Sequence, residues 1–524
     1  MAPNTPSIFN DVIGPVMRGP SSSHCAGAVR IGRLARELMG GRIEHVRMEF
    51  DAKGSLAFTH ESQGSDMGLF GGLLGWDAQD ERLVDAAAAI RAAGIQVELR
   101  IADFGDPHPN TYRLTLKNSD ESRGMIALST GGGMIEVIDI DGFPLSLKGD
   151  YFETLIYASS QTQEIIGLLK QHAAADDIAL RGGAGNWLIQ VKTQATIPQS
   201  LLSEIRSRPG VAGIRTLSPV LPVLSDKSMR VPFSTCAEML AFDPPANLDL
   251  GRLAARYESA RGNIGEGEVS ARMTEIVRIL RRSIAQGIQG THAENRILGP
   301  QSGAFQAALQ GGRLLDSGML NTMILYVSAL MEVKSAMGVI VAAPTAGSCG
   351  GLPGAVIGAA ERMGLSEDHM AHAMLAAGMI GVFICARSTF AAEVCGCMAE
   401  CGSGSGMAAA ALVTLAGGSA RQAVDAASMA LQNTLGMICD PVANRVEVPC
   451  LGRNVLAASN ALACANMALA GYDAVIPLDE TIATMDRVGR SLPMELRCTA
   501  LGGLSITATS KAIEKKMASK ISRS

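Results

Sequence analysis

The sequence predicts a multidomain protein with an N-terminal α+β domain, a small ferredoxin-like unit and a C-terminal all-α domain. Three observations support this fold class. The chain has 524 residues, more than a single hydrophobic core normally organises. Before about residue 222, apolar and polar residues alternate in several segments, as they do in half-buried strands. After about residue 250, apolar residues recur at intervals of three and four, as in amphipathic helices.

Residues 1–148 are expected to form the α+β domain. A helical pattern begins near residue 80 and stops at Gly94, and glycine is favoured just beyond a helix. The alternation typical of strands occurs in four segments: HVRMEFDA, IQVELRIADF, TYRLTLKN and MIEVIDIDG. This mixture indicates a self-contained domain built on a sheet.

Residues 150–222 predict a smaller unit with the order β-α-β-β-α-β, which is ferredoxin-like. Its segments are YFETLIYAS, SQTQEIIGLLKQHAA, the hairpin DIALRGGAGNWLIQVKTQ, PQSLLSEIRSR and VAGIRTLSP. Residues 223–250 contain prolines and little periodicity, so we expect a linker there. Residues 251–524 are expected to be all-α, because segments such as SARMTEIVRILRRSIAQGI and SARQAVDAASMALQNTLGM have helical spacing.

The composition excludes several classes of partner. The formal net charge is −5, so no excess of basic residues attracts nucleic acid or an anionic membrane. The first 15 residues lack the apolar run of a secretory signal, and the longest uncharged apolar stretch, residues 373–386, is too short to span a bilayer. We therefore expect a soluble, cytoplasmic protein with no nucleic-acid or membrane partner.

The eleven cysteines are concentrated in the C-terminal half, where nine lie between Cys349 and Cys498. A disulfide scaffold would be smaller and more evenly cross-linked, so this distribution favours metal binding or catalysis. The alternative for any one of them is a free thiol in the core, because cysteine is among the most buried residue types.

Three of these cysteines stand in distinctive settings. Cys397 lies in GCMAECG, Cys439 in GMICDPV and Cys450 in VEVPCLGRN. Pro441 and Pro449 interrupt regular structure beside the second and third. We therefore expect these thiols on loops, where the sulfurs can face a shared centre.

Four segments resemble the catalytic domain of the iron–sulfur-dependent L-serine dehydratases: GCMAECGSGSGMAAAA, NTLGMICDPV, VEVPCLGRN and APTAGSCGGLPGA. GPSSSHCAGAVRIGRLAR, residues 19–36, resembles the β, or allosteric-substrate-binding, domain of that family. Residues 150–222 fall where many members carry an ACT domain. The resemblance covers nearly the whole chain and implies that the β part is fused ahead of the catalytic part.

The resemblance implies that Cys397, Cys439 and Cys450 hold one [4Fe–4S] cluster with an open iron. That iron would act as a Lewis acid on the β-hydroxyl of L-serine while a protein base removes the α-proton, giving pyruvate and ammonia. A homodimer active in amino-acid degradation and gluconeogenesis is expected. The neighbouring Cys395 and Cys401 are expected to be packing residues, although either could be a fourth ligand.

The resemblance also implies candidate catalytic and substrate-binding residues in the N-terminal domain. Ser22, Ser23 and His24 precede a helix expected to start near Gly27, and the family has this segment near the substrate. Serines there can cap the helix, and free amides at a helix start can also bind a carboxylate. His108, in DPHPNTYR, matches a second family histidine.

In the catalytic domain, Thr345 and Ser348 lie in a turn of small residues, APTAGSCGGLPGA. The turn could be a plain connection between helices, but the family match favours a pocket wall whose hydroxyls and amides bind the substrate carboxylate.

The sequence departs from the family pattern in ways that concern the substrate. Gln63 stands where a family motif has histidine, and His60 is nearby but out of register. Lys334 and Arg387 are introduced at positions expected to line the pocket, which would suit a substrate with an extra carboxylate. The alternatives are therefore a hydro-lyase for another β-hydroxy acid, a non-catalytic cluster-containing sensor, and a zinc site.

Overall fold

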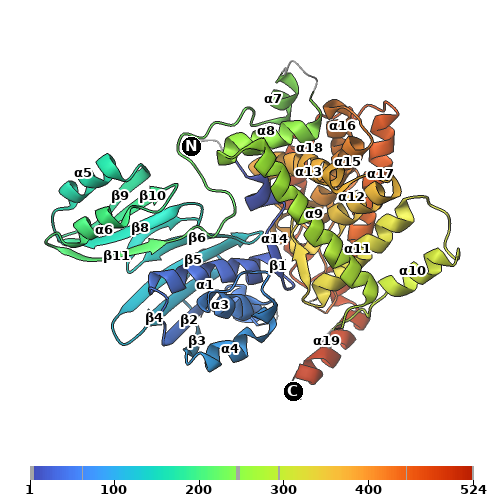
Figure 1. The fold of residues 1–524 in the computed structure, drawn as a ribbon. Coiled ribbons are helices and arrows are strands. Elements are labelled where there is room, and N and C mark those ends of the chain that lie inside the picture. The colour runs from blue at the N-terminus through green and yellow to red at the C-terminus, as the bar shows by residue number, and fades with distance from the viewer. Residues whose placement is uncertain are drawn as a thin grey trace. The chain divides into compact units, whose positions relative to one another are not determined.

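The computed structural model describes residues 5–61, 63–242, 248–292, 296–443, 445 and 447–521, with side chains to residue 517. The chain divides into two compact units. One comprises Ser21–Met229, and the other comprises Met1–Pro20 together with Arg230–Ser524. Figure 1 shows that the first is built on sheets and the second on helices, as the sequence predicted.

The unit Ser21–Met229 begins with a six-stranded sheet in the order β3-β2-β4-β5-β6-β7. Strands β2 and β3 are parallel, and the remaining neighbours are antiparallel. The four predicted strands are confirmed, and the sheet has two more, β5 and β7. The strands are β2 (His45–Asp51), β3 (Gln96–Ala102), β4 (Thr111–Lys117), β5 (Ser122–Gly131), β6 (Met134–Ile140) and β7 (Phe143–Leu147).

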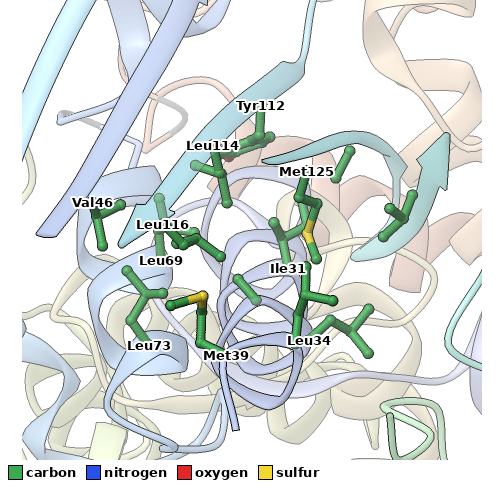
Figure 2. Close-up of a cluster of buried hydrophobic side chains, with 14 of the residues drawn as sticks. Ile31, Leu34, Met39, Val46, Leu69, Leu73, Tyr112, Leu114, Leu116 and Met125 are labelled. Carbon is green, nitrogen blue, oxygen red and sulfur yellow. The ribbon is translucent and has the colours of Figure 1, made fainter. Parts of the chain in front are cut away.

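Helices cover one face of this sheet (Figure 1). They are α1 (Gly27–Leu38), α2 (Leu56–Thr59), α3 (Ser65–Leu73) and α4 (Ala86–Ala92), with short turns η2 (Ser22–Ala26) and η3 (Glu81–Asp85). The predicted start of α1 at Gly27 is confirmed. Ile31 and Leu34 on α1 and Val46 and Leu114 on the sheet belong to one buried cluster, shown in Figure 2. Alternation along the strands and helical spacing along α1 therefore place apolar side chains in a common core.

Helices α1 and α3 approach each other closely because glycines face across the contact. A Cβ added at Gly72 would lie 2.2 Å from the carbonyl oxygen of Val29. Any larger residue there would separate the two helices.

Residues 152–217 form a four-stranded antiparallel sheet in the order β11-β8-β10-β9. The elements are β8 (Phe152–Ala158), α5 (Thr162–His172), β9 (Ala175–Gly183), β10 (Asn186–Thr193), α6 (Gln199–Arg206) and β11 (Val211–Leu217). The predicted β-α-β-β-α-β order is confirmed. The two sheets belong to one compact unit, in which the Tyr157 hydroxyl donates to Asp141 Oδ2 over 2.7 Å.

The N-terminal residues 5–20 pack in the helical unit, whereas the sequence prediction grouped them with the α+β domain. Strand β1 (Val16–Arg18) pairs antiparallel with β12 (Val339–Val341), and η1 (Ile8–Val12) contacts α13. The Ile8 amide donates to the buried carboxylate of Glu258 over 2.7 Å. Burial of this pair requires the segment to stay in the helical unit, because an unpaired buried carboxylate would be costly.

In the rest of the unit, the described residues form helices and the short strand β12, so the all-α prediction is confirmed in its main feature. Helix α7 lies within the predicted linker, of which residues 243–247 are outside the described residues. The helices are α7 (Cys236–Ala241), α8 (Leu250–Gly262), α9 (Glu266–Gln289), α10 (Ser302–Gln310), α11 (Leu320–Ser335), α12 (Gly351–Arg362), α13 (Glu367–Arg387), α14 (Ala392–Cys395), α15 (Ser403–Leu415), α16 (Ala420–Gln432), α17 (Cys450–Leu469), α18 (Leu478–Ser491) and α19 (Ala508–Ile521), with turns η4 (Ala346–Ser348), η5 (Met398–Gly402), η6 (Met494–Leu496) and η7 (Gly503–Ile506).

Helix α15 is the centre of this unit. It contacts α12, α13, α16 and α17, and alanine and glycine along it allow close packing (Figure 1). Among the described residues, α13 is the one helix long and apolar enough to cross a membrane, but 78% of its most apolar window is buried inside the protein. It is therefore packed as a core helix.

Candidate active site

The three cysteines predicted as metal ligands meet in the helical unit. Cys397 follows Gly396, whose φ of 68° turns the chain out of α14. Cys439 lies in the loop after α16, as predicted. The loop predicted for Cys450 is wrong, because this residue is the first of α17 and Pro449 precedes the helix rather than breaking it. Hydrogen bonds from the thiols of Cys401, Cys439 and Cys450 hold the pKa of Cys397 well below its usual value. The three predicted ligands are thus buried side by side, with a fourth thiol beside them.

A cation faces this group of sulfurs. Arg453, one turn into α17, donates from Nη1 to Cys397 Sγ over 3.4 Å. Its Nη2 donates to Asp440 Oδ1 over 2.5 Å, and Asp440 also accepts from the Leu504 amide over 2.8 Å. The guanidinium is therefore fixed with one edge on sulfur, where it favours the thiolate form.

The remaining cysteines of this region differ in orientation. Cys395 packs against α18, where its Sγ lies 4.0 Å from the carbonyl oxygen of Asp486. Cys401 lies beside Cys397 and accepts a contact of 3.6 Å from Asn454 Nδ2. The sequence predicted the same packing role for both residues. In the structure only Cys401 lies beside Cys397, whereas Cys395 faces α18.

Cys498 is a neighbour that sequence reasoning missed. Its amide donates to the Cys439 carbonyl oxygen over 2.9 Å, and its thiol hydrogen-bonds the Cys439 thiol. No signal in the sequence joins the two, because they are brought together by an isolated parallel bridge between Cys439 and Arg497. Among the described residues, no three or more His, Cys, Asp or Glu side chains are arranged to hold a single metal ion.

The turn that contains Thr345 and Ser348 borders the cysteine group through Glu400. Thr345 Oγ1 donates to Glu400 Oε1 over 2.7 Å and lies 3.2 Å from Ser348 Oγ, so these hydroxyls have partners within the chain. Burial, followed by the nearby Cys397 thiol, raises the pKa of Glu400 to about 8. Asn454 Oδ1 accepts from the amide of Gly351 over 2.8 Å, which ties the turn to α17.

Lys334 and Arg387, the two introduced cations, have different surroundings. Arg387 forms an ion pair with Asp479, and 31% of its side chain is exposed. Lys334 lies in the last turn of α11 and is 1% exposed, and its ammonium has no hydrogen-bond partner among the described residues.

In the unit Ser21–Met229, His24 is held on both sides of its ring. Nδ1 lies 2.9 Å from Ser21 Oγ, and Nε2 lies 3.0 Å from Thr59 Oγ1. Burial lowers the pKa of His24 to about 4. Of the two serines predicted beside it, Ser22 is buried, and the Ser23 carbonyl accepts from Ser129 Oγ over 2.6 Å.

The other histidines of this unit form separate arrangements. His60 Nδ1 lies 2.8 Å from Asp66 Oδ2, and the described residues provide no partner for Nε2. This pair was missed in the sequence, where His60 was only noted as out of register with Gln63. His108 is half-buried, which lowers its pKa, and its Nδ1 accepts from the Asn110 amide over 3.2 Å.

Comparison with known proteins places this geometry in a family. The model of the family described as serine dehydratase alpha chain matches residues 188–505. The chain belongs to the serine dehydratase family. The predicted resemblance is thereby confirmed.

Relatives match different shares of the chain. A probable L-serine dehydratase alpha chain of Bacillus subtilis is 37% identical over 250 residues, which are 48% of this chain and 83% of the relative. A probable L-serine dehydratase beta chain of the same organism is 34% identical over 218 residues, 40% of this chain and 98% of the relative. An L-serine dehydratase of Streptomyces coelicolor is 27% identical over 439 residues, 82% of this chain and 91% of the relative. One chain here is thus similar to two separate chains of B. subtilis.

Proposed function

We propose that the protein is an iron–sulfur-dependent L-serine dehydratase that converts L-serine to pyruvate and ammonia. The observation that carries this proposal is the meeting of Cys397, Cys439 and Cys450 in a buried group, in a chain of the serine dehydratase family. The relatives are named L-serine dehydratases, which supports the choice of substrate. We propose a cytoplasmic homodimer, following the sequence prediction.

The residues present fit a [4Fe–4S] cluster. Cys397, Cys439 and Cys450 would hold it, because thiolate sulfur is the ligand that such clusters require. Arg453, beside the Cys397 sulfur, offsets negative charge in this buried group. When bound, a cluster with one iron free of protein ligands supplies a Lewis acid that favours loss of a β-hydroxyl.

The reaction also needs a group that accepts the α-proton. The candidates are His24 and His108, as the family resemblance implies. Burial lowers the pKa of His108, so its ring is neutral and can accept a proton. His24 is held neutral by burial between two hydroxyls, so its role would be to position groups by hydrogen bonds.

We also propose names for the two sheet regions. The six-stranded region corresponds to the allosteric-substrate-binding-like domain. The four-stranded region corresponds to an ACT-like domain, which its β-α-β-β-α-β order supports.

The test is purification and assay without oxygen. We expect a brown protein with about four iron and four sulfide per chain that forms pyruvate from L-serine. Air should bleach the colour and abolish the activity, and iron with thiol should restore both. A colourless zinc protein with full activity, or an iron protein inactive on all β-hydroxy acids, would contradict the proposal.

A further inference from the structure

The ammonium of Lys334 is the most unusual charge in the helical unit. The side chain is 1% exposed, and no other lysine of the described residues has a buried ammonium without a hydrogen-bond partner. A buried cation without an anion is strongly unfavourable, so a site of this kind requires a negative group.

The surroundings of Lys334 place it at the cysteine group. Its positive charge acts on Cys450, Cys349 and Glu400, where it opposes the rise in pKa that the Cys397 thiol causes at Cys450 and that burial causes at the other two. One turn earlier on α11, the Met331 sulfur lies 3.9 Å from Cys349 Sγ, which fixes this face of the helix against the turn 343–351. The ammonium is therefore buried beside the group to which the proposed function assigns catalysis.

The neighbouring polar side chains have hydrogen-bond partners of their own. Thr345 and Ser348 hydrogen-bond each other, and Thr345 also donates to Glu400. None of these groups accepts a hydrogen bond from Lys334 Nζ. Arg387 differs in this respect, because Asp479 already neutralises it.

We infer that Lys334 binds the α-carboxylate of the substrate, and that the substrate is a β-hydroxy amino acid with a single carboxylate. This inference rests on the proposed function. A carboxylate supplies the missing anion and accepts a charge-assisted hydrogen bond from the ammonium. One unpaired buried ammonium matches one carboxylate. A second carboxylate would need a second free cation, and Arg387, the other introduced cation, is already paired with Asp479.

The experiment compares the holoenzyme with Lys334→Met and Lys334→Arg, all prepared without oxygen. The surface variant Lys511→Met, which also loses a lysine of this unit, is the matched control. Iron per chain and the visible spectrum are measured first. Binding of L-alanine, which has the α-carboxylate but no hydroxyl to lose, is then measured by calorimetry against L-alaninamide. Finally, kcat/KM is measured for L-serine, L-serinamide and 3-hydroxyaspartate.

We expect Lys334→Met to keep wild-type iron but to bind L-alanine about 100-fold more weakly, the size of one lost charged hydrogen bond. The preference for L-serine over L-serinamide should fall by the same factor, whereas Lys334→Arg should retain most of it and Lys511→Met all of it. The wild type should use 3-hydroxyaspartate less well than L-serine.

Three results would overturn the inference. Loss of iron in Lys334→Met with retention in Lys334→Arg would show that the ammonium balances the charge of the cluster. Unchanged L-alanine binding in Lys334→Met would show that it binds no carboxylate. A wild-type preference for 3-hydroxyaspartate would contradict the single carboxylate. Failure of the proposed function is distinguishable, because it would appear in the wild type as no pyruvate from L-serine.

Discussion

Acid should destabilise the unit Ser21–Met229 through His24. The Thr59 hydroxyl donates to the Ser55 carbonyl over 2.7 Å, so its oxygen must accept from His24 Nε2–H. Nδ1 is then the acceptor of the Ser21 hydroxyl. Both hydrogen bonds require the neutral ring. A proton on Nδ1 would point at the Ser21 hydroxyl hydrogen, so the hydrogen bond from Ser21 would be lost. Burial lowers the pKa of His24 from 6.5 to about 4, which also favours the neutral ring.

The size of the effect follows from proton linkage. Because the folded pKa lies below the unfolded one, the unfolded chain takes up the proton first as the pH falls. The contribution of His24 is fully present above pH 6.5 and is lost between pH 6.5 and about 4. The loss amounts to about 2 kcal/mol by pH 5 and about 3 kcal/mol by pH 4.

The assay is urea unfolding followed by tryptophan fluorescence from pH 7.5 to pH 4.5. The chain has two tryptophans, Trp76 and Trp187, and both lie in this unit, so the signal reports on it alone. In His24→Gln, the amide can donate to Thr59 in place of Nε2–H but cannot titrate. The pH dependence of the stability should therefore be smaller by about 2 kcal/mol at pH 5. His172→Gln, at an exposed position on α5, is the control. The reasoning is refuted if His24→Gln and wild type lose stability equally with acid.

Three further outcomes are expected. The Cys439→Ser variant should contain no iron, whereas Cys464→Ser, which removes a buried thiol of α17 outside the cysteine group, should keep the wild-type iron content. Equal iron contents in the two variants would exclude Cys439 as a ligand. Arg453→Lys should keep the positive charge but lose the two-sided contact by which the guanidinium joins Cys397 to Asp440. The reduction potential of the iron centre, measured by redox titration, should therefore shift, and an unchanged potential would contradict this. Gly68→Ala should lower the thermal stability of the sheet unit, since the new Cβ would lie 2.3 Å from a backbone carbonyl; an unchanged melting temperature would show that the helices can separate.

The sequence determined the features that repeat along the chain. Alternation predicted β2, β3, β4 and β6, and helical spacing predicted the C-terminal domain, because burial of one face imposes its period on adjacent residues. The β-α-β-β-α-β order of residues 150–222 and the start of α1 at Gly27 were readable for the same reason. The cysteine motifs indicated the family through local segments whose flanking residues are distinctive.

The tertiary structure alone decided which distant side chains meet. Residues 5–20 pack with Glu258, Cys498 lies beside Cys439, and His60 pairs with Asp66. These pairings depend on how elements pack in three dimensions, and no periodicity records them.

The clearest case is that of the two introduced cations. Lys334 and Arg387 looked alike in the sequence, as positive charges near expected pocket segments. The structure gave Arg387 a carboxylate from α18 and left the ammonium of Lys334 buried without one. Burial and pairing, which are properties of the packed state, determine whether a charge is structural or awaits a ligand.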